Sequence, residues 1–122
     1  MTEKKILIAE DEKPMARALE IKLNKAGFET TVVFDGVSAV KELQAGKYDL
    51  LLLDLMMPNK DGFSVLSDLK EIKNKVPVIV STNLNQKEDI EKAMDLGAKD
   101  YFVKSDTTIS EVVDHVKKVL GL

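Results

Sequence analysis

Five side chains in this 122-residue sequence have the types and positions that phosphate and metal chemistry require. Each stands at or just after the end of a short apolar run, and the five are Glu10, Asp11, Asp54, Thr82 and Lys104. Three carboxylates gathered at one place repel one another, which is costly unless a cation lies between them. A hard divalent cation such as Mg²⁺ prefers carboxylate, water and phosphate oxygens as ligands. With an ammonium and a hydroxyl added, the set suits phosphoryl transfer, with Asp54 as the nucleophile that forms an acyl phosphate.

Each of these residues also has an ordinary structural interpretation. An acidic residue after a strand is commonly a helix N-cap or a solvated loop residue. For any one residue alone, that interpretation is the better one. The functional interpretation depends on all five side chains meeting, and therefore on the elements that position them.

Short apolar runs alternate five times with segments of helical periodicity. This alternation predicts an α/β, doubly wound (βα)5 sandwich with parallel strands, right-handed crossovers and helices on both faces. Because ligands of such a sheet bind beyond the carboxyl ends of its strands, the five side chains should meet at one edge. The second strand ends in Asp35–Gly36, which has turn chemistry only. We predict strands at residues 6–9, 31–34, 50–53, 76–80 and 101–103, and helices at about 14–26, 37–46, 63–72, 86–96 and 109–120.

Local signals mark the ends of several of these helices. Gly27 should stop the first helix, because glycine is favoured just past a helix end. Asn85 with Glu88, and Thr108 with Glu111, have the spacing of capping boxes that would open the fourth and fifth helices.

The amino-acid composition limits which binding partners and which cellular compartment we expect for this chain. The chain has 18 Lys and Arg residues against 21 Asp and Glu residues, a formal net charge of -3, no Cys and 5% aromatic residues. The absence of cysteine excludes disulfides, thiolate zinc sites and cysteine nucleophiles. Neither the charge nor the aromatic content favours direct nucleic-acid binding, and no signal peptide or membrane-length apolar run is present. We therefore expect residues 1–122 to be a single cytoplasmic domain without membrane association, and with no output domain in this chain.

Four segments carry a resemblance to the receiver domains of bacterial response regulators, and the resemblance covers nearly the whole chain. These segments are Ile6–Glu12, Asp54–Gly62, Pro77–Thr82 and Gly97–Lys104. The resemblance implies a flavodoxin-like sheet with strand order 2-1-3-4-5. It also implies phosphorelay signalling, in which a sensor histidine kinase or a histidine phosphotransfer protein phosphorylates Asp54. Such a domain catalyses only its own phosphorylation and dephosphorylation, and a downstream target protein reads the change.

The same resemblance assigns roles to the residues of the site. Asp11 would ligate Mg²⁺ or Mn²⁺ directly, and Glu10 would hold the ion through water. Asp54 and the backbone carbonyl of Met56 would be the further protein ligands. Lys104 would pair with the phosphoryl group on Asp54.

A switch and an output surface are also implied. Thr82 would bond an incoming phosphoryl oxygen and shift inward, and Tyr101 would move inward with it; without the resemblance, Tyr101 is a strand tyrosine that fills a gap beside the fourth helix. The switched surface would comprise the fourth helix, the fifth strand and the fifth helix, and its charges could pair across a phosphorylation-dependent homodimer or simply be solvated. Its candidate contacts are Lys87, Lys92, Asp100, Lys117 and Lys118.

Three positions depart from the commonest receiver pattern. Glu10 replaces the more usual Asp, Asn83 stands where a small residue is usual, and Ser105 stands where Pro is usual. A cis peptide costs about 2.5–4 kcal/mol before a non-proline residue, against roughly 0.5–1 kcal/mol before proline. We therefore predict a trans Lys104–Ser105 bond and an altered loop.

Met56 and Leu84 flank the expected path of a water that would attack the phosphoryl group. Both side chains are apolar, so neither can hydrogen-bond and orient that water. This predicts slow self-dephosphorylation. The alternative is that both residues simply cover the loop.

Other classes of protein fit the sequence less well. A phosphatase with an Asp nucleophile would need a second carboxylate at the position of Met56. A flavin or dinucleotide carrier would need a Gly- or Thr-rich loop after the first strand, where Glu10–Lys13 stands instead. The remaining alternative is a degenerate receiver that acts as a phosphorylation-independent binding module. The intact set of five chemistry-bearing residues argues against it.

Overall fold

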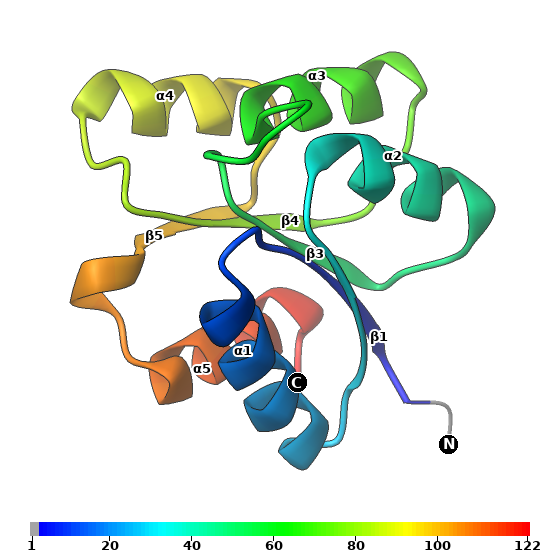
Figure 1. The fold of residues 1–122 in the computed structure, drawn as a ribbon, viewed down its shortest axis with the longest axis vertical. Coiled ribbons are helices and arrows are strands. Elements are labelled where there is room, and N and C mark those ends of the chain that lie inside the picture. The colour runs from blue at the N-terminus through cyan, green and yellow to red at the C-terminus, as the bar shows by residue number, and fades with distance from the viewer. Residues whose placement is uncertain (1–2) are drawn as a thin grey trace.

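Five parallel strands alternate with five helices, and the strands form one central sheet (Figure 1). The computed structural model describes residues 3–122. The strands are β1 (Lys5–Ala9), β2 (Glu29–Val33), β3 (Leu50–Leu53), β4 (Val78–Thr82) and β5 (Asp100–Val103). The helices are α1 (Lys13–Lys25), α2 (Gly36–Ala45), α3 (Gly62–Glu71), α4 (Lys87–Asp95) and α5 (Ile109–Leu120), with a 3₁₀ turn at Lys104–Asp106. The sheet order is β2-β1-β3-β4-β5, which confirms the doubly wound, flavodoxin-like fold.

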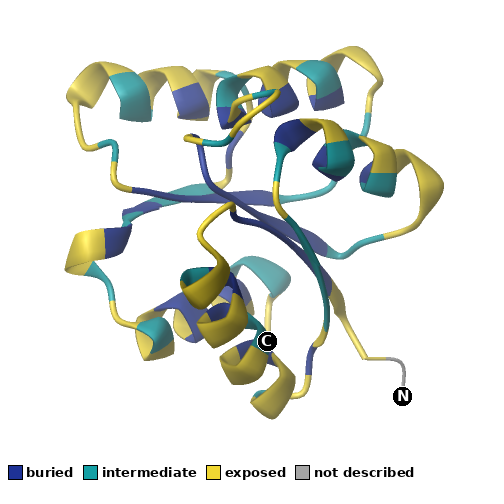
Figure 2. Cartoon of the chain, in the orientation of Figure 1, coloured by how far each residue is buried: buried dark blue, intermediate teal, exposed yellow. Residues whose placement is uncertain are grey.

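Helices α1 and α5 cover one face of the sheet, and α2, α3 and α4 cover the other (Figure 1). Successive strand residues point to opposite faces, so each strand contributes to both layers. In β1, Ile6 and Ile8 join the apolar cluster beneath α1 and α5, whereas Leu7 and Ala9 join the cluster on the other face. The central strands β1 and β3 are therefore buried on both sides, as their continuous apolar runs predict (Figure 2).

Strand β4 lies two residues further along the chain than the apolar run at 76–80 indicates. Its register explains the shift, because Val78 pairs with Leu51 of β3 and Thr82 pairs with Val103 of β5. Thr82 thus belongs to the strand itself. Its backbone is held in the sheet at the carboxyl edge, where a functional side chain gains rigid support.

One of the two predicted capping boxes forms. Thr108 accepts from the Glu111 backbone N–H, and the Glu111 side chain accepts in return from the Thr108 backbone. Gly27 directly follows the cap of α1, as predicted. Both signals are local, and nothing in the tertiary structure opposes them.

The predicted capping box of Asn85 with Glu88 is wrong. Helix α4 begins later, after Gln86, and the Gln86 side chain makes no capping hydrogen bond. The Tyr101 hydroxyl donates to the Leu84 carbonyl at 2.6 Å and so ties the preceding loop to β5. This tertiary contact sets the path into α4 and overrides the local signal.

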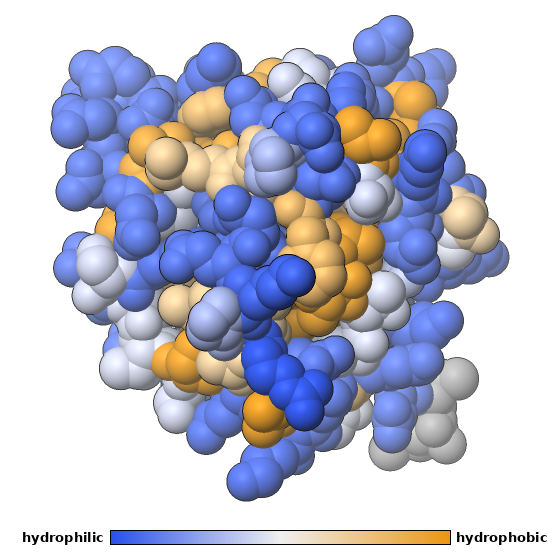
Figure 3. Space-filling model, viewed as in Figure 1, coloured by the Kyte–Doolittle hydropathy of each residue, from blue (hydrophilic) through white to orange (hydrophobic). Residues whose placement is uncertain are grey.

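The surface on the face shown in Figure 3 is mostly hydrophilic, with apolar side chains gathered near its middle. The exposed large apolar residues include Phe34 and Met56, which follow β2 and β3 in the chain. Within residues 3–122, no helix combines the length and the apolar character that a bilayer span requires.

Candidate functional site

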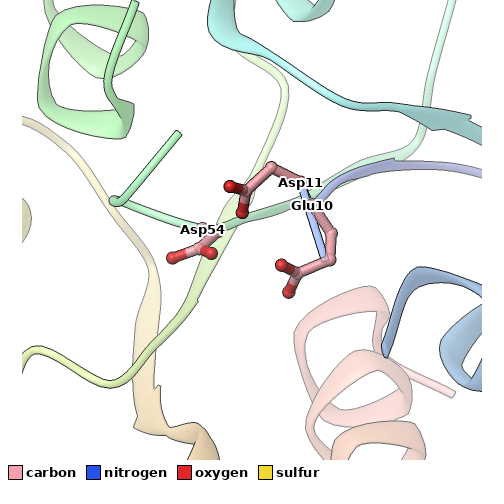
Figure 4. Close-up of side chains that lie close together, drawn as sticks. All are labelled: Glu10, Asp11 and Asp54. Carbon is pink, nitrogen blue, oxygen red and sulfur yellow. The ribbon is translucent and has the colours of Figure 1, made fainter. Parts of the chain in front are cut away.

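Three carboxylates meet at the carboxyl edge of the two central strands (Figure 4). Glu10 and Asp11 follow β1, and Asp54 follows β3. The two strands are neighbours in the sheet, with Ala9 opposite Leu53. One carboxylate oxygen from each acid lies within 4.8 Å of the other two. Glu10 and Asp54 are buried, whereas Asp11 is exposed, so the cluster is open to solvent on one side.

Lys104 lies among these acids and is itself buried. Its Nζ donates to Asp54 Oδ2 at 2.9 Å and is in ion-pair contact with Glu10 Oε1. Glu12 Oε1 lies 3.7 Å from the same Nζ, and the Glu12 backbone N–H donates to Glu10 Oε2 at 3.1 Å. Glu12 was not among the predicted site residues, and only its place beside Glu10 and Asp11 in the sequence signals it.

Burial and charge act in opposite directions on Glu10 and Lys104. Burial raises the pKa of Glu10 to about 7; the contact with the Lys104 ammonium opposes this rise, and the charge of Asp54 adds to it. Burial alone would lower the pKa of Lys104, but its contacts with the carboxylates of Glu10 and Asp54 outweigh burial, and the net shift of the Lys104 pKa is upward. Lys104 therefore stays charged at neutral pH. One ammonium group faces three clustered carboxylates, which leaves negative charge at the site.

The oxygen donors fit a hard divalent cation. Glu10 Oε1 is buried and accepts no hydrogen bond from residues 3–122, despite its contact with Lys104. Carboxylate and carbonyl oxygens are the ligands that Mg²⁺ and Mn²⁺ prefer. The exposed side of Asp11 gives access to water, which Mg²⁺ retains in most protein sites. The Met56 backbone N–H donates to Asp54 Oδ1 at 3.1 Å and so orients the Asp54 carboxylate.

Thr82 is fully buried at the end of β4 and is connected to Tyr101 through the backbone of Leu84. The Leu84 N–H donates to Thr82 Oγ1 at 3.4 Å, and the Leu84 carbonyl accepts from the Tyr101 hydroxyl at 2.6 Å. Burial raises the pKa of Tyr101 to about 12, and the charges of Asp89 and Asp54 add to this. The phenol therefore remains a hydrogen-bond donor at all physiological pH values.

The two loops that follow Thr82 and Lys104 are joined by a hydrogen bond. The Ser105 backbone N–H donates to Asn83 Oδ1 at 3.1 Å. A proline at position 105 would have no N–H to donate. All peptide bonds within residues 3–122 are trans, which confirms the predicted trans Lys104–Ser105 bond. Two departures from the common receiver pattern are thus in contact, and only their shared position after strand ends hints at this in the sequence.

The turn after β2 also supports the site, which corrects the interpretation of Asp35–Gly36 as a turn only. Asp35 caps α2 and accepts from Asn59 Nδ2 at 3.2 Å. A Cβ at Gly36 would lie 2.1 Å from the Lys60 carbonyl oxygen, so only glycine fits. These contacts hold the loop that follows Asp54 against the start of α2.

Gly62 allows α3 to begin close to Asp54. A Cβ at Gly62 would lie 2.5 Å from the Asp54 carbonyl oxygen and 2.7 Å from Leu55 Cα. The Gly62 N–H donates to the Leu55 carbonyl at 3.0 Å. Asp61 caps the helix by accepting from the Ser64 N–H at 2.9 Å. The loop from Asp54 to α3 is therefore held at both ends.

Two of the candidate output residues lie on α4. Lys87 Nζ lies 3.7 Å from Glu91 Oε1, one turn further along the same exposed helix face. The Lys92 ammonium lies over the Phe63 ring of α3, 4.4 Å from its centroid. The Lys92 side chain therefore contacts α3 within the same molecule.

The other three candidate output residues lie on β5 and α5. Asp100 Oδ2 lies 2.5 Å from His115 Nδ1, so this carboxylate is engaged within the molecule. Lys117 and Lys118 are exposed in the last turn of α5. The two residues expected to flank the water path differ in exposure, since Met56 is exposed and Leu84 is half-buried.

Comparisons with known proteins agree with this geometry. The model of the response regulator receiver domain family matches residues 6–117. The transcriptional regulatory protein DltR of Streptococcus agalactiae is 38% identical over 100 residues, which are 82% of this chain and 45% of that protein. The sensory transduction protein RegX3 of Mycolicibacterium smegmatis is 39% identical over 115 residues, which are 94% of this chain and 50% of that protein. The chain thus spans about half the length of these curated relatives.

Solved structures show the same fold. The receiver domain of a Francisella response regulator superposes with a TM-score of 0.91 at 32% identity, covering 97% of both chains. A CheY-like receiver domain protein from Methanospirillum hungatei superposes with a TM-score of 0.92 over 98% of this chain and 95% of that one. At 19% identity, this second comparison shows a shared fold and nothing more.

Proposed function

This chain belongs to the family of response regulator receiver domains, which act in phosphorelay signalling, and we propose that it accepts a phosphoryl group on Asp54. One observation carries the proposal. The buried Asp54 carboxylate is held by the Lys104 ammonium at 2.9 Å and lies beside the carboxylates of Glu10 and Asp11. A nucleophile held between a cation and a cation-binding set of oxygens is suited to phosphoryl transfer, where the protein mainly positions groups and neutralises charge.

The reaction would form one bond and break another. A carboxylate oxygen of Asp54 attacks the phosphorus of a phosphohistidine on a sensor histidine kinase or a histidine phosphotransfer protein. The new phosphorus–oxygen bond gives an acyl phosphate. The phosphorus–nitrogen bond breaks, and its electron pair leaves with the donor imidazole. Lys104 is placed to stabilise the charge of the transferred oxygens.

Glu10, Asp11 and Asp54, with the Met56 carbonyl, would hold Mg²⁺ or Mn²⁺. When bound, the ion supplies charge neutralisation at the phosphoryl oxygens. The protein contributes the rest of the electrostatic balance. Lys104 offsets two buried carboxylates before the reaction, and after it can pair with the phosphoryl group instead.

We further propose that Thr82 and Tyr101 form the switch through Leu84. A phosphoryl oxygen on Asp54 would accept a hydrogen bond from the Thr82 hydroxyl and draw it away from the Leu84 N–H, from which Thr82 Oγ1 now accepts only a long bond of 3.4 Å. Movement of Thr82 would then disturb the Leu84 carbonyl, which holds the Tyr101 hydroxyl. A two-state change of this kind would be read at α4, β5 and α5 by a downstream protein or by a second copy of the chain.

The apolar character of Met56 and Leu84 supports slow loss of the phosphoryl group. Neither side chain can orient a water for attack on the acyl phosphate. A phosphorylation-independent binding module is less well supported, because it would need neither the buried ammonium nor the three clustered acids.

Intact-mass measurement after treatment with acetyl phosphate and Mg²⁺ tests the proposal. We expect the native chain to gain the mass of one phosphoryl group. Asp54→Ala should gain none, and Asp114→Ala, which removes an exposed carboxylate from α5, should behave like the native chain. Circular dichroism should show that each variant is folded. Absence of the gain in the native chain, or its persistence in folded Asp54→Ala, would refute the proposal.

A further inference from the structure

A surface cavity of about 480 Å³ lies at the amino edge of β4, between the last turns of α3 and α4. We call it the lysine-rimmed cavity, because its floor is apolar and its rim is basic. Its volume is within the range of roughly 300–1,000 Å³ that is usual for ligand pockets. The floor is formed by Leu66, Leu69, Val76, Val78 and Leu96. The rim is formed by the exposed residues Lys70, Lys73, Lys75 and Lys99.

The charge of this cavity has one sign. No acidic side chain lines it, and none of the rim lysines forms an ion pair within the described part of the chain, residues 3–122. Helices α3 and α4 both end here, and each helix C-terminus carries about half a negative charge. Four ammonium groups outweigh these two helix ends, so the rim remains positive.

Lys73 has a backbone conformation that its side chain disfavours. Its φ is 59°, in the left-handed region, directly after the α3 cap at Ile72. The equivalent positions after α1 and α4 hold Gly27 and Gly97, which adopt such angles without steric cost. The conformation closes the end of α3, where glycine would serve at least as well. Here the side chain supplies one of the rim charges.

We propose that the lysine-rimmed cavity docks an acidic segment of a partner protein. One aliphatic or aromatic side chain of that segment would enter the apolar floor, and its carboxylates would pair with the rim. The lysines come from the end of α3, the α3–β4 loop and the residue before β5, so an extended segment can reach several of them. Ammonium groups are flexible point charges, which suits carboxylates spaced along a peptide better than bidentate binding of one phosphate.

The rim is already organised before any segment binds. The Asn74 side chain accepts from the Val76 N–H at 3.0 Å and donates to the Leu43 carbonyl at 3.4 Å. The Asn74 N–H donates to the Leu69 carbonyl at 2.9 Å, which closes the turn that carries Lys73. A preformed rim lowers the entropy cost of docking. The docking requires no phosphoryl group on Asp54, so it can be tested with the unmodified chain.

Nuclear magnetic resonance of the ¹⁵N-labelled chain tests the proposal with a short synthetic peptide, a central Leu flanked by Glu residues. We expect amide shifts confined to residues 69–76 and 96–99. Exchange of the flanking Glu for Gln should abolish the shifts, and a central Ala should weaken them. Absence of shifts at millimolar peptide, or shifts elsewhere on the surface, would contradict the proposal.

Charge reversal provides the matched comparison. Lys73→Glu with Lys75→Glu should weaken peptide binding about tenfold. Lys22→Glu with Lys25→Glu reverses two exposed lysines in the last turn of α1, and should leave binding unchanged. Equal weakening by both pairs would mean non-specific attraction. Rim-dependent binding to phosphatidylserine vesicles without peptide binding would assign the cavity to a lipid surface, and would also overturn the proposal.

Lys73→Gly separates docking from folding. Glycine relieves the left-handed backbone, so the thermal midpoint should rise. Loss of one rim charge should weaken peptide binding about threefold. A higher midpoint with unchanged peptide affinity would show that Lys73 has no part in docking.

Discussion

At the scale of single residues, Lys104 is the centre of the site's charge balance. It lies between Glu10 and Asp54, and all three side chains are buried. Removing one partner of a buried ionic group is far more costly than the net value of the contact, because the remaining charges lose their compensation. The stability of the metal-free chain should therefore depend strongly on this ammonium.

Lys104→Met retains most of the side-chain volume but removes the charge. We expect the free energy of unfolding, measured by urea denaturation without divalent cations, to fall by about 3 kcal/mol. Lys117→Met removes an exposed lysine near the end of α5 and should change the free energy by less than about 0.5 kcal/mol. Equal stability of the two variants would show that the buried carboxylates do not depend on Lys104.

Tyr101 provides a pH-dependent prediction at the same scale. Its pKa is about 12 in the folded chain, chiefly through burial, against an ordinary value of 10. The folded state therefore holds the phenolic proton more tightly than the unfolded state does. The neutral Tyr101 phenol therefore contributes in full to the free energy of unfolding below pH 10. This contribution is lost as the pH rises toward 12.

Ultraviolet titration of the phenolate absorbance measures this pKa directly. The difference between the native chain and Tyr101→Phe should show one phenol that ionises near pH 12. Tyr48→Phe is the comparison that retains Tyr101. A Tyr101 midpoint near pH 10 would mean that burial does not shift its pKa.

At the scale of elements, the loops between strands and helices are joined to one another. Asn83, after β4, accepts from Ser105, after β5. The turn after β2 contacts the loop after β3 through Asn59 and Lys60. The hydrogen bond from Lys104, after β5, to Asp54, after β3, joins these two pairs of loops, so strain introduced in one loop should reach Asp54.

Asn83→Ala tests the link between the loops after β4 and β5. We expect the Ser105 amide to exchange with deuterium faster, because it loses its acceptor, and stability to fall by about 0.5–1.5 kcal/mol. Asn85→Ala lies in the same loop, and the Asn85 side chain makes no hydrogen bond within residues 3–122. Its Ser105 exchange rate should match that of the native chain; the same acceleration in both variants would count against the link.

Gly62→Ala tests the close approach of α3 to Asp54. The added Cβ would lie 2.5 Å from the Asp54 carbonyl oxygen, so the loop must shift. We expect a loss of about 1–3 kcal/mol in stability, together with weaker Mg²⁺ binding. At Gly46 the nearest atom would be 3.6 Å away, which is ordinary contact. Gly46→Ala should therefore bind Mg²⁺ like the native chain, and similar losses in both variants would refute the steric argument.

At the scale of the whole molecule, the two core layers position strand ends that carry most of the site. Folding brings Glu10, Asp11 and Asp54 together and so works against their mutual repulsion. A cation that binds only the folded state stabilises it by mass action, by about 2.7 kcal/mol at a concentration one hundred times its dissociation constant.

Mg²⁺ should therefore raise the thermal midpoint of the native chain in a concentration-dependent way. Asp11→Asn should lose most of this rise, because it removes an exposed charge from the cluster. Asp114→Asn should retain it. Calorimetry with and without a chelator measures the difference, and a native midpoint insensitive to Mg²⁺ would exclude a divalent site at these acids.

The amino-acid sequence alone was enough to predict the fold and the meeting of the acids. Alternating apolar runs and amphipathic segments predict a parallel sheet, and the carboxyl ends of parallel strands share one edge. That rule brings Glu10, Asp11 and Asp54 together without any knowledge of packing. The box of Thr108 with Glu111 was equally predictable, because its partners are neighbours in the chain.

Only the tertiary structure decided where α4 begins, which side chains support the site, and where the lysine-rimmed cavity lies. Each of these depends on contacts between segments that are distant in the chain, such as Asn83 with Ser105 and Gly36 with Lys60. The spacing of apolar residues identifies which face of a helix or strand is buried, but not which other element packs against that face. Partners are set by how the layers pack, because a close-packed interior leaves little room for alternative contacts.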